Sequence, residues 1–294
     1  GYGEQLLFDD LNQMLKATKP TAVTAFNHIY GNLEVVEAAA PLGIHVMVEK
    51  PLAVSLDHAQ RMARLAREND IHLLTNYETT WYGSNALLGA MVDSGRVGEI
   101  RKMVIHDGHK GPIEIGCNEE FLDWLLDPEL NGGGAITDFG CYGADLMTWL
   151  MKGERPVSVT ALTQQIKSGR YERVDDEATI IGAYPRAQGI IQASWNWPFN
   201  RKDTQVYGQT GYVHTIDGSR MISRLAESEP EKSITAPALP APVNDPFTYL
   251  AAVVRGEWQP GKDLSSLEVT LVAMEILDAA IRSAQEGKTV ILDK

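Results

Sequence analysis

The chain has 294 residues, of which 44% are apolar and 22% charged, and its formal net charge is −13. This length suits one large domain or two ordinary ones, and the acidity argues against a protein that tracks the phosphates of a nucleic acid. Two cysteines exclude a disulfide scaffold and a four-cysteine zinc site, and no apolar run reaches the length of a membrane span. The first residues show no signal peptide, so we expect a cytoplasmic protein; an export signal stays open if the start is incomplete.

The first 82 residues alternate between strands and helices, which is typical of an α/β domain. We predict helices over 8–16, 33–42 and 55–69, and strands over 21–26, 44–48 and 71–75. Strands separated by crossover helices pair in parallel with right-handed connections. Residues 1–82 therefore predict part of a parallel, doubly wound domain of the Rossmann type.

The pattern changes after residue 82, where long strands follow one another with short turns between them. We predict helices over 85–95, 119–126, 140–151, 245–255 and 265–286, strands over 99–107, 155–168, 177–184, 187–197, 202–208 and 211–216, and a proline-rich loop over 226–246. Such strands favour a mostly antiparallel sheet with one face covered by the helices. Residues 83–294 therefore predict an α+β domain with a large, open-faced sheet.

A Gly-x-Gly-x-x-Gly turn, which holds the pyrophosphate in a dinucleotide-binding fold, follows none of the predicted strands. The run Gly132-Gly133-Gly134 lacks this spacing, and no strand leads into it. Either the fold is different, or the first two β-α units, roughly 60 residues together, are not in the chain as printed.

Residues 45–52, His-Val-Met-Val-Glu-Lys-Pro-Leu, are the most informative stretch of the sequence. An apolar strand ends there in Glu49, Lys50 and Pro51, and an amphipathic helix follows. Lys50 is thus predicted at the carboxyl end of a strand, the edge at which α/β sheets bind ligands. A lysine that is merely solvated at the end of a strand is the alternative interpretation.

Residues 131–150 form a second informative segment, in which three glycines precede Asp138 and Tyr142. On a helix, residues at this spacing project from the same face one turn apart. The glycines allow close approach of the backbone. An N-capping aspartate followed by a core tyrosine would explain the pattern equally well.

Together the two segments resemble the signature stretches of the Gfo/Idh/MocA oxidoreductase family, named for glucose-fructose oxidoreductase and inositol dehydrogenase. The segments that carry this resemblance are Glu49-Lys50-Pro51, the run from Gly132 through Asp138 and Tyr142 to Asp145, the loop Thr24–Tyr30, the pair Asp175-Asp176 and the turn Gly208–Gly211. The resemblance covers essentially the whole chain. It implies a Rossmann domain for NAD or NADP and an α/β domain that holds a sugar, a polyol or a related compound.

The resemblance also implies which residues form the sites. Those implied for the cofactor are Phe26, Asn27, His28, Glu49, Lys50, Pro51 and Asn76, and those implied for the substrate are Lys50, Trp81, Asp138, Tyr142 and Trp195. In the family, the lysine and an Asp-x-x-x-His pair line the nicotinamide cleft. Here Tyr142 replaces the histidine, as in a subset that includes the dihydrodiol and xylose dehydrogenases. The departure therefore indicates a tyrosine-containing variant of the family.

The residue types suit hydride transfer at a carbinol carbon, because the hydroxyl proton must be taken up as the carbonyl forms. A phenol with a pKa near 10 is a poor base at neutral pH, and a neighbouring ammonium favours the phenolate. Our hypothesis for the catalytic residues is that Tyr142 exchanges the proton, Lys50 lowers its pKa and anchors the substrate oxygen, and Asp138 orients Lys50 or a sugar hydroxyl.

Two weaker signals concern aromatic and histidine residues. Trp195 and Trp197 fall on one face of a predicted strand, where they suit sugar stacking, a core or an oligomer interface. His106 and His109 resemble a two-histidine metal pair, but without a third ligand nearby we predict no metal site.

The expected function is NAD(P)-dependent oxidation or reduction of a carbohydrate-type hydroxyl. An NAD-dependent glycosidase that works by transient oxidation and elimination is one alternative, and a binding protein without a complete cofactor site is another. We expect a small-molecule partner, no nucleic acid and no membrane. An uncovered sheet that carries tryptophans also predicts a homo-oligomer, a dimer or tetramer, formed through that face.

Overall fold

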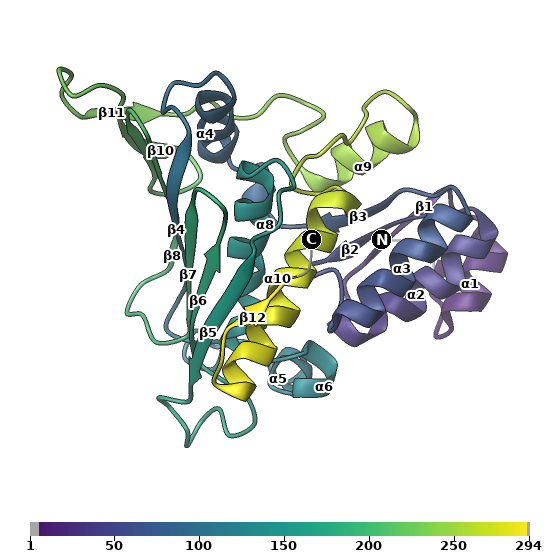
Figure 1. Ribbon diagram of the computed structural model, residues 1–294. Helices are drawn as coiled ribbons and strands as arrows, with labels where there is room; N and C mark the ends of the chain where they lie inside the picture. Colours follow the sequence, from purple (N-terminus) through teal and green to yellow (C-terminus); the bar gives the residue numbers. More distant parts are fainter. Residues whose placement is uncertain (1–5, 293–294) are drawn as a thin grey trace.

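The computed structural model describes residues 6–292, and its N-terminal part contains a small parallel sheet with strand order β1-β2-β3 (Figure 1). Its strands are β1 (Ala22–Ala25), β2 (His45–Glu49) and β3 (Leu73–Asn76). The surrounding helices are α1 (Leu11–Thr18), η2 (Ile29–Gly31), α2 (Asn32–Ala39), η3 (Ala40–Leu42), α3 (Leu56–Glu68) and η4 (Glu78–Trp81). Ser55 caps α3 by accepting a hydrogen bond from the His58 amide at 3.2 Å. Because β1 pairs with β2 and β2 with β3 in parallel, the carboxyl ends of all three strands meet at one edge.

The second sheet has nine strands in the order β11-β10-β9-β8-β4-β7-β6-β5-β12. They are β4 (Ile100–Gly108), β5 (Ser158–Gln164), β6 (Glu177–Ala183), β7 (Gln188–Ser194), β8 (Arg201–Gly208), β9 (Tyr212–Thr215), β10 (Arg220–Arg224), β11 (Lys232–Thr235) and β12 (Val290–Ile291). All neighbours are antiparallel except β4 and β7, which run in parallel. The predicted mostly antiparallel sheet is thus confirmed.

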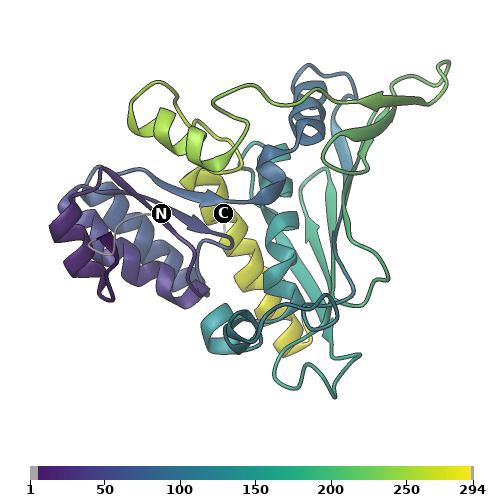
Figure 2. The same ribbon diagram turned by 180° about the vertical axis from the view of Figure 1, so that it is seen from behind.

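Helices cover one face of this sheet and leave the other open, as Figures 1 and 2 show for the described residues. The helices of this part are α4 (Gly83–Asp93), α5 (Glu119–Leu125), α6 (Pro128–Asn131), α7 (Ala135–Asp138), α8 (Gly140–Leu150), α9 (Pro246–Val254) and α10 (Leu267–Glu286). At Gly143 a β-carbon would lie 2.4 Å from the Ile191 side chain on β7, so only glycine lets α8 approach the sheet this closely.

The C-terminal helices return to the small sheet. Tyr249, Leu250 and Val253 of α9 form a buried cluster with Met47 of β2 and Leu74 of β3. In Figure 1, α10 runs between the two sheets. The proposed boundary after residue 82 therefore separates two sheets that the last helices hold together.

Most of the predicted helices and strands are present with ends that differ by a few residues. The predicted loop over 226–246 is wrong in part, because it contains β11, which pairs with β10. Neither β10 nor β12 was predicted, since strands of five and two residues are too short for alternation of apolar and polar residues to mark them in the sequence. None of the helices between residues 6 and 292 is both long and apolar enough to cross a membrane.

Candidate active site

An ion pair between Lys50 and Asp138 lies where the two sheets meet. Lys50 directly follows β2, and Asp138 is the last residue of the short helix α7. The Lys50 Nζ atom lies 2.5 Å from Asp138 Oδ1 and donates a second hydrogen bond to the Asp138 carbonyl oxygen at 2.9 Å. The structure therefore brings together the two segments that the sequence singles out.

Both partners of this pair are held in their charged forms. Burial disfavours the Asp138 carboxylate, but the Lys50 ammonium outweighs it and lowers the pKa of Asp138 below its usual value. Burial likewise disfavours the Lys50 ammonium, yet the Asp138 carboxylate raises the pKa of Lys50. Lys50 is thus a fixed positive charge and hydrogen-bond donor at neutral pH.

Trp195 orients the other oxygen of the same carboxylate. Its indole Nε1 donates to Asp138 Oδ2 at 3.0 Å, and its side chain is fully buried. The expectation that Trp195 contacts substrate is therefore wrong, because no part of the ring is exposed. Trp197 lies elsewhere, 6.1 Å from the His106 ring, since β7 ends at Ser194 and the alternation ends with it.

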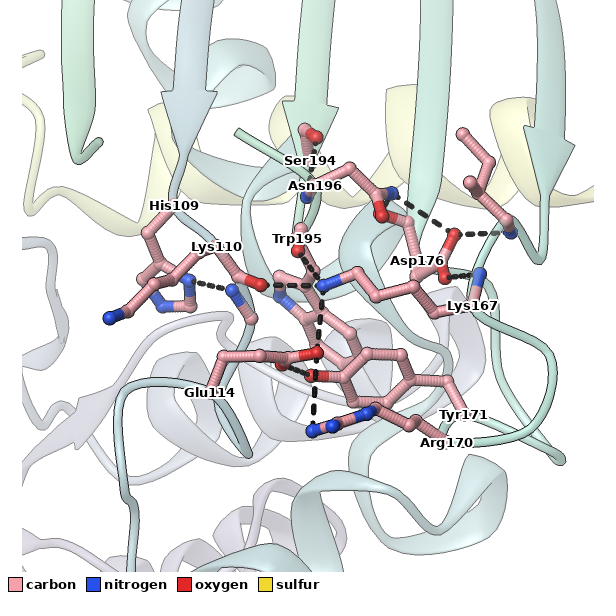
Figure 3. Close-up of polar contacts among 12 residues, drawn as sticks. His109, Lys110, Glu114, Lys167, Arg170, Tyr171, Asp176, Ser194, Trp195 and Asn196 are labelled. Atoms are coloured by element: carbon pink, nitrogen blue, oxygen red, sulfur yellow. Dashed lines mark hydrogen bonds and ion pairs between the residues drawn. The ribbon is translucent and has the colours of Figure 1, made fainter. Parts of the chain in front are cut away.

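Trp195 is held in turn by the network of polar contacts in Figure 3. The Lys167 ammonium donates to the carbonyl oxygen of Trp195 at 2.6 Å and to Glu114 Oε1 at 3.0 Å. The Tyr171 hydroxyl donates to Glu114, and its ring packs 5.0 Å from the Trp195 indole. This network holds the backbone and the ring of Trp195, whose indole donates to Asp138.

Tyr142, in the first turn of α8, lies within the same cluster. Its ring centroid is 5.0 Å from Lys50 Nζ, and the Tyr77 ring packs edge-on against it at 5.6 Å. The ammonium thus lies over the ring, as expected for converging residues. Burial, reinforced by Asp107 and other acidic groups, nevertheless raises the pKa of Tyr142 well above its usual value. The net direction is opposite to the expected lowering, because desolvation dominates.

Lys202, Glu78 and Asp107 complete the cluster and were missed by the sequence reasoning. Lys202 Nζ lies 4.3 Å from the Tyr142 ring centroid and 2.6 Å from Glu78 Oε2. Lys202 on β8 is paired in register with Asp107 on β4, so both side chains leave the same face of the sheet. The sequence signal that could have revealed Lys202 and Asp107 is a charged residue on each of two strands, at a position facing the helix-covered side of the sheet.

The residues expected to hold the cofactor gather at the carboxyl ends of the parallel strands. A cavity of about 450 Å³ is lined there by Phe26, Asn27, Glu49, Lys50 and Asp138, among others. The Phe26 side chain is exposed, and the buried Asn27 Oδ1 atom has no hydrogen-bond partner. An aromatic surface, an amide acceptor and an ammonium fit a nicotinamide ring with its carboxamide.

The other expected cofactor residues support this edge without lining the cavity. Asn76 donates to Glu49 Oε1 at 2.5 Å and accepts from the Trp81 indole at 2.8 Å. His28 caps η2 through its Nδ1, which accepts from the Gly31 amide. Pro51 is buried, and its carbonyl accepts from Asn32. Trp81 packs on Tyr249 and lies outside the lining of both cavities at the ion pair, and its contact with substrate stays a prediction.

A second cavity, of about 490 Å³, lies on the side of the large sheet. Its lining residues are Glu78, Tyr82, Gly108, His109, Pro112, Ile115, Cys117, Phe121, Leu125, Asp138, Phe139, Asn200, Arg201, Lys202, Ile216, Asp217 and Arg220. Asp138, Phe121 and Leu125 belong to both linings. Asp138 therefore stands at the junction of the two cavities.

Other features carry less chemistry. Cavities of about 490, 480 and 550 Å³ lie along α10, away from the ion pair. His106 bonds Asp203 at 3.0 Å, whereas His109 accepts from the Gly111 amide and packs on Phe139, so these histidines do not converge. No cluster of three metal-ligating side chains occurs within residues 6–292.

Two family models match the chain. Residues 2–77 match an "Oxidoreductase family, NAD-binding Rossmann fold", and residues 86–214 match a "GFO/IDH/MocA C-terminal domain".

Individual curated relatives are similar to the chain at low sequence identity. The chain is 28% identical over 200 residues to 1,5-anhydro-D-fructose reductase of Ensifer adhaerens, covering 67% of this chain and 55% of the relative. It is 29% identical over 147 residues to an NADP-dependent D-xylose 1-dehydrogenase of Haloarcula marismortui, covering 50% and 39%. The matches thus span about half the length of these curated relatives.

Solved structures share the fold. An inositol dehydrogenase homolog of Azotobacter vinelandii, crystallised with NAD⁺, superposes with a TM-score of 0.85 at 18% identity, covering 99% of this chain and 84% of that one. At this identity the likeness shows the fold alone.

Proposed function

The chain belongs to the Gfo/Idh/MocA oxidoreductase family, and on this premise we propose that it oxidises or reduces a hydroxyl or carbonyl carbon of a neutral sugar or polyol with NAD or NADP. The observation that carries the proposal is the position of the Lys50–Asp138 pair. Asp138 lines both the cavity at the small sheet and the cavity at the large sheet. A reacting carbon held at this junction would lie between cofactor and substrate pockets.

The cofactor half of the site would be formed by Phe26, Asn27, Glu49 and Lys50. The exposed Phe26 ring and the partnerless Asn27 oxygen suit a flat ring with an amide substituent. A nicotinamide bound there supplies or accepts the hydride.

The proton is handled by this chain's own residues. The Lys50 ammonium would hold the substrate oxygen and stabilise negative charge as it develops there. Asp138 keeps this ammonium charged and fixes its position. Tyr142, protonated at neutral pH because burial raises its pKa, would donate the proton when a carbonyl is reduced.

The charges around the larger cavity favour an uncharged substrate. Lys202 is paired with Glu78 at 2.6 Å, and Arg220 with Asp217 at 2.5 Å. Arg201 is paired with Asp203, and burial lowers the pKa of His109. With the cations already paired, a phosphate or carboxylate would find no spare positive charge, whereas hydroxyl groups can bond to these polar groups.

The test is steady-state turnover with NAD⁺ and NADP⁺ against a panel of neutral aldoses, inositols and linear polyols, followed by nicotinamide absorbance. Aldonic acids and sugar phosphates serve as charged comparisons. We expect turnover with at least one neutral compound, and a loss of ~10²-fold or more in Lys50→Ala. Lys232→Ala, which removes an exposed lysine on β11, is the control. Unchanged turnover in Lys50→Ala would overturn the proposal.

Two other outcomes separate the alternative functions. Redox-neutral release of nitrophenol from a nitrophenyl glycoside, dependent on NAD, would identify a glycosidase that works by oxidation and elimination. Sugar binding by calorimetry without any binding of NADH or NADPH would identify a binding protein.

We also propose that the open face of the large sheet pairs with a second copy of the chain. This face carries exposed Leu162 on β5 and Tyr207 on β8, with half-buried Ile181 and Ile190 between them. Of the two expected tryptophans, Trp195 does not contribute, because it is fully buried and bonded to Asp138. A two-fold pairing of such a face would bury these side chains.

A further inference from the structure

We propose that Lys202 is a positioning residue that acts through Tyr142, and that the opposed charges of Lys202 and Glu78 set how readily the Tyr142 hydroxyl releases its proton. This inference deepens the proposed function and rests on it only for its catalytic meaning. It concerns the side chains of Lys202, Glu78 and Tyr142, which come from β8, η4 and α8.

Geometry makes Lys202 the nearer of two ammonium groups to the phenol ring. Its Nζ atom is 4.3 Å from the Tyr142 centroid, against 5.0 Å for Lys50. Lys50 donates two hydrogen bonds to Asp138, whereas Lys202 is paired with Glu78. Each ammonium group thus has its own carboxylate partner, and Lys202 faces the ring from the large sheet.

Glu78 is the counter-charge of Lys202. Its Oε2 atom lies 2.6 Å from Lys202 Nζ, and its Oε1 accepts from the Tyr82 hydroxyl at 2.6 Å. Glu78 belongs to η4 after β3, whereas Lys202 belongs to β8. The pair therefore joins the small sheet's exit loop to the large sheet across the Tyr142 ring.

The charge of Lys202 favours the phenolate, and the charge of Glu78 opposes it, because opposite charges stabilise and like charges destabilise an ionised group. Glu78 is among the acidic groups that raise the pKa of Tyr142. The titratable groups around Tyr142 are Asp107 on β4, Glu78 on η4, Asp138 on α7, Cys141 on its own helix, Tyr77 after β3, Lys50 after β2 and Lys202 on β8.

The experiment replaces Tyr142 in the full chain by a ring-fluorinated tyrosine, whose hydroxyl is more acidic than that of tyrosine. Its fluorine NMR signal is followed through a pH titration, without cofactor or substrate. The test variants are Lys202→Met and Glu78→Gln. Lys232→Met and Glu229→Gln are matched controls, because Lys232 and Glu229 form a similar pair at 2.7 Å on the surface near β11.

We expect the ionisation midpoint to rise by about one pH unit in Lys202→Met and to fall by a similar amount in Glu78→Gln, which is a roughly tenfold change in proton affinity each way. The controls should titrate as the parent does. Equal midpoints in all variants, shifts of the same sign in the two test variants, or a Glu78→Gln signal that stays un-ionised to the pH of unfolding would each overturn the inference.

This readout is independent of turnover. A chain that oxidises no sugar but shows the two opposite shifts would disprove the proposed function and leave the role of Lys202 intact. A chain that turns over substrate but shows no shift in either variant would support the proposed function and disprove the role of Lys202.

Discussion

Lys50 Nζ and Asp138 Oδ1 lie 2.5 Å apart although 88 positions separate the two residues in the chain. Lys50 is placed by the carboxyl end of β2, and Asp138 by the turn from α7 to α8. Neither segment alone makes this pair, because each supplies only one of its two partners. The pair therefore couples the small parallel sheet to the helix-covered face of the large one.

Asp138→Asn should leave the Lys50 ammonium buried without its partner. We expect a loss of about 3–5 kcal/mol in unfolding free energy and of ~10²-fold or more in turnover. Urea unfolding measures the first quantity and initial rates the second. The double variant Lys50→Met/Asp138→Leu should unfold at higher urea than Asp138→Asn alone; a double variant that is less stable would contradict the pairing.

Tyr142→Phe should lower carbonyl reduction by ~10²-fold, because the general acid is lost. Burial raises the pKa of Tyr142, so in the parent chain the phenol stays protonated through neutral pH. Reduction should therefore be flat across neutral pH and fall only in strongly alkaline solution, whereas alcohol oxidation should rise with pH. Profiles of kcat against pH, measured for both carbonyl reduction and alcohol oxidation, test this role. A bell-shaped profile centred near neutral pH would contradict it.

Trp195→Phe should remove the indole donor to Asp138 while keeping most of the packing on Tyr171. A hydrogen bond to a charged group contributes about 1.5–3 kcal/mol, so we expect turnover to fall by ~10-fold or more. Trp197→Phe is the control, since Trp197 lies near His106 instead. Equal rates in the two variants would mean that the indole does not orient the carboxylate.

Asp145→Asn tests a buried carboxyl group of the second signature segment. Both Asp145 carboxyl oxygens lack hydrogen-bond partners, and burial raises the pKa of Asp145 well above 3.8. As pH rises above the unfolded-state pKa, ionisation favours the unfolded chain until the folded group also ionises. The unfolding free energy of Asp145→Asn, relative to that of the parent chain, should therefore rise by on the order of 1.4 kcal/mol per pH unit from about pH 4 upward. Chemical denaturation at several pH values measures it, and a gain that is constant with pH would contradict the burial.

Leu162→Glu should disrupt pairing of the open sheet face. Leu162 is 64% exposed on β5, so a charge there costs the folded monomer little. Light scattering should report a lower molar mass for this variant than for the parent chain. Leu42→Glu, at an exposed position of η3 beside the small sheet, is a control for charge alone. An unchanged mass in Leu162→Glu would place the interface elsewhere.

The sequence predicts the parallel sheet and the site's main pair for physical reasons. Apolar runs such as 45–49 and their flanking helices have clear periods, and Glu49-Lys50-Pro51 marks the end of a strand. The wider cluster could not be predicted. Lys202 and Asp107 meet only through the register of β8 with β4, which depends on turn geometry and strand order.

The misjudged aromatic residues have a similar cause. Alternation placed Trp195 and Trp197 on one face, but β7 ends at Ser194, so the rule does not reach them. The pKa of Tyr142 was also misjudged, because a sequence indicates neighbouring charges but not the depth of burial.

A crystal structure of the complex with reduced cofactor and a neutral sugar that supports turnover would show whether Lys50 holds the reacting oxygen. We expect the nicotinamide ring in the cavity beside Phe26 and Asn27, and a sugar oxygen within hydrogen-bond distance of Lys50 Nζ. A nicotinamide ring or a sugar bound only in the cavities along α10, with Lys50 and Asp138 untouched, would contradict it.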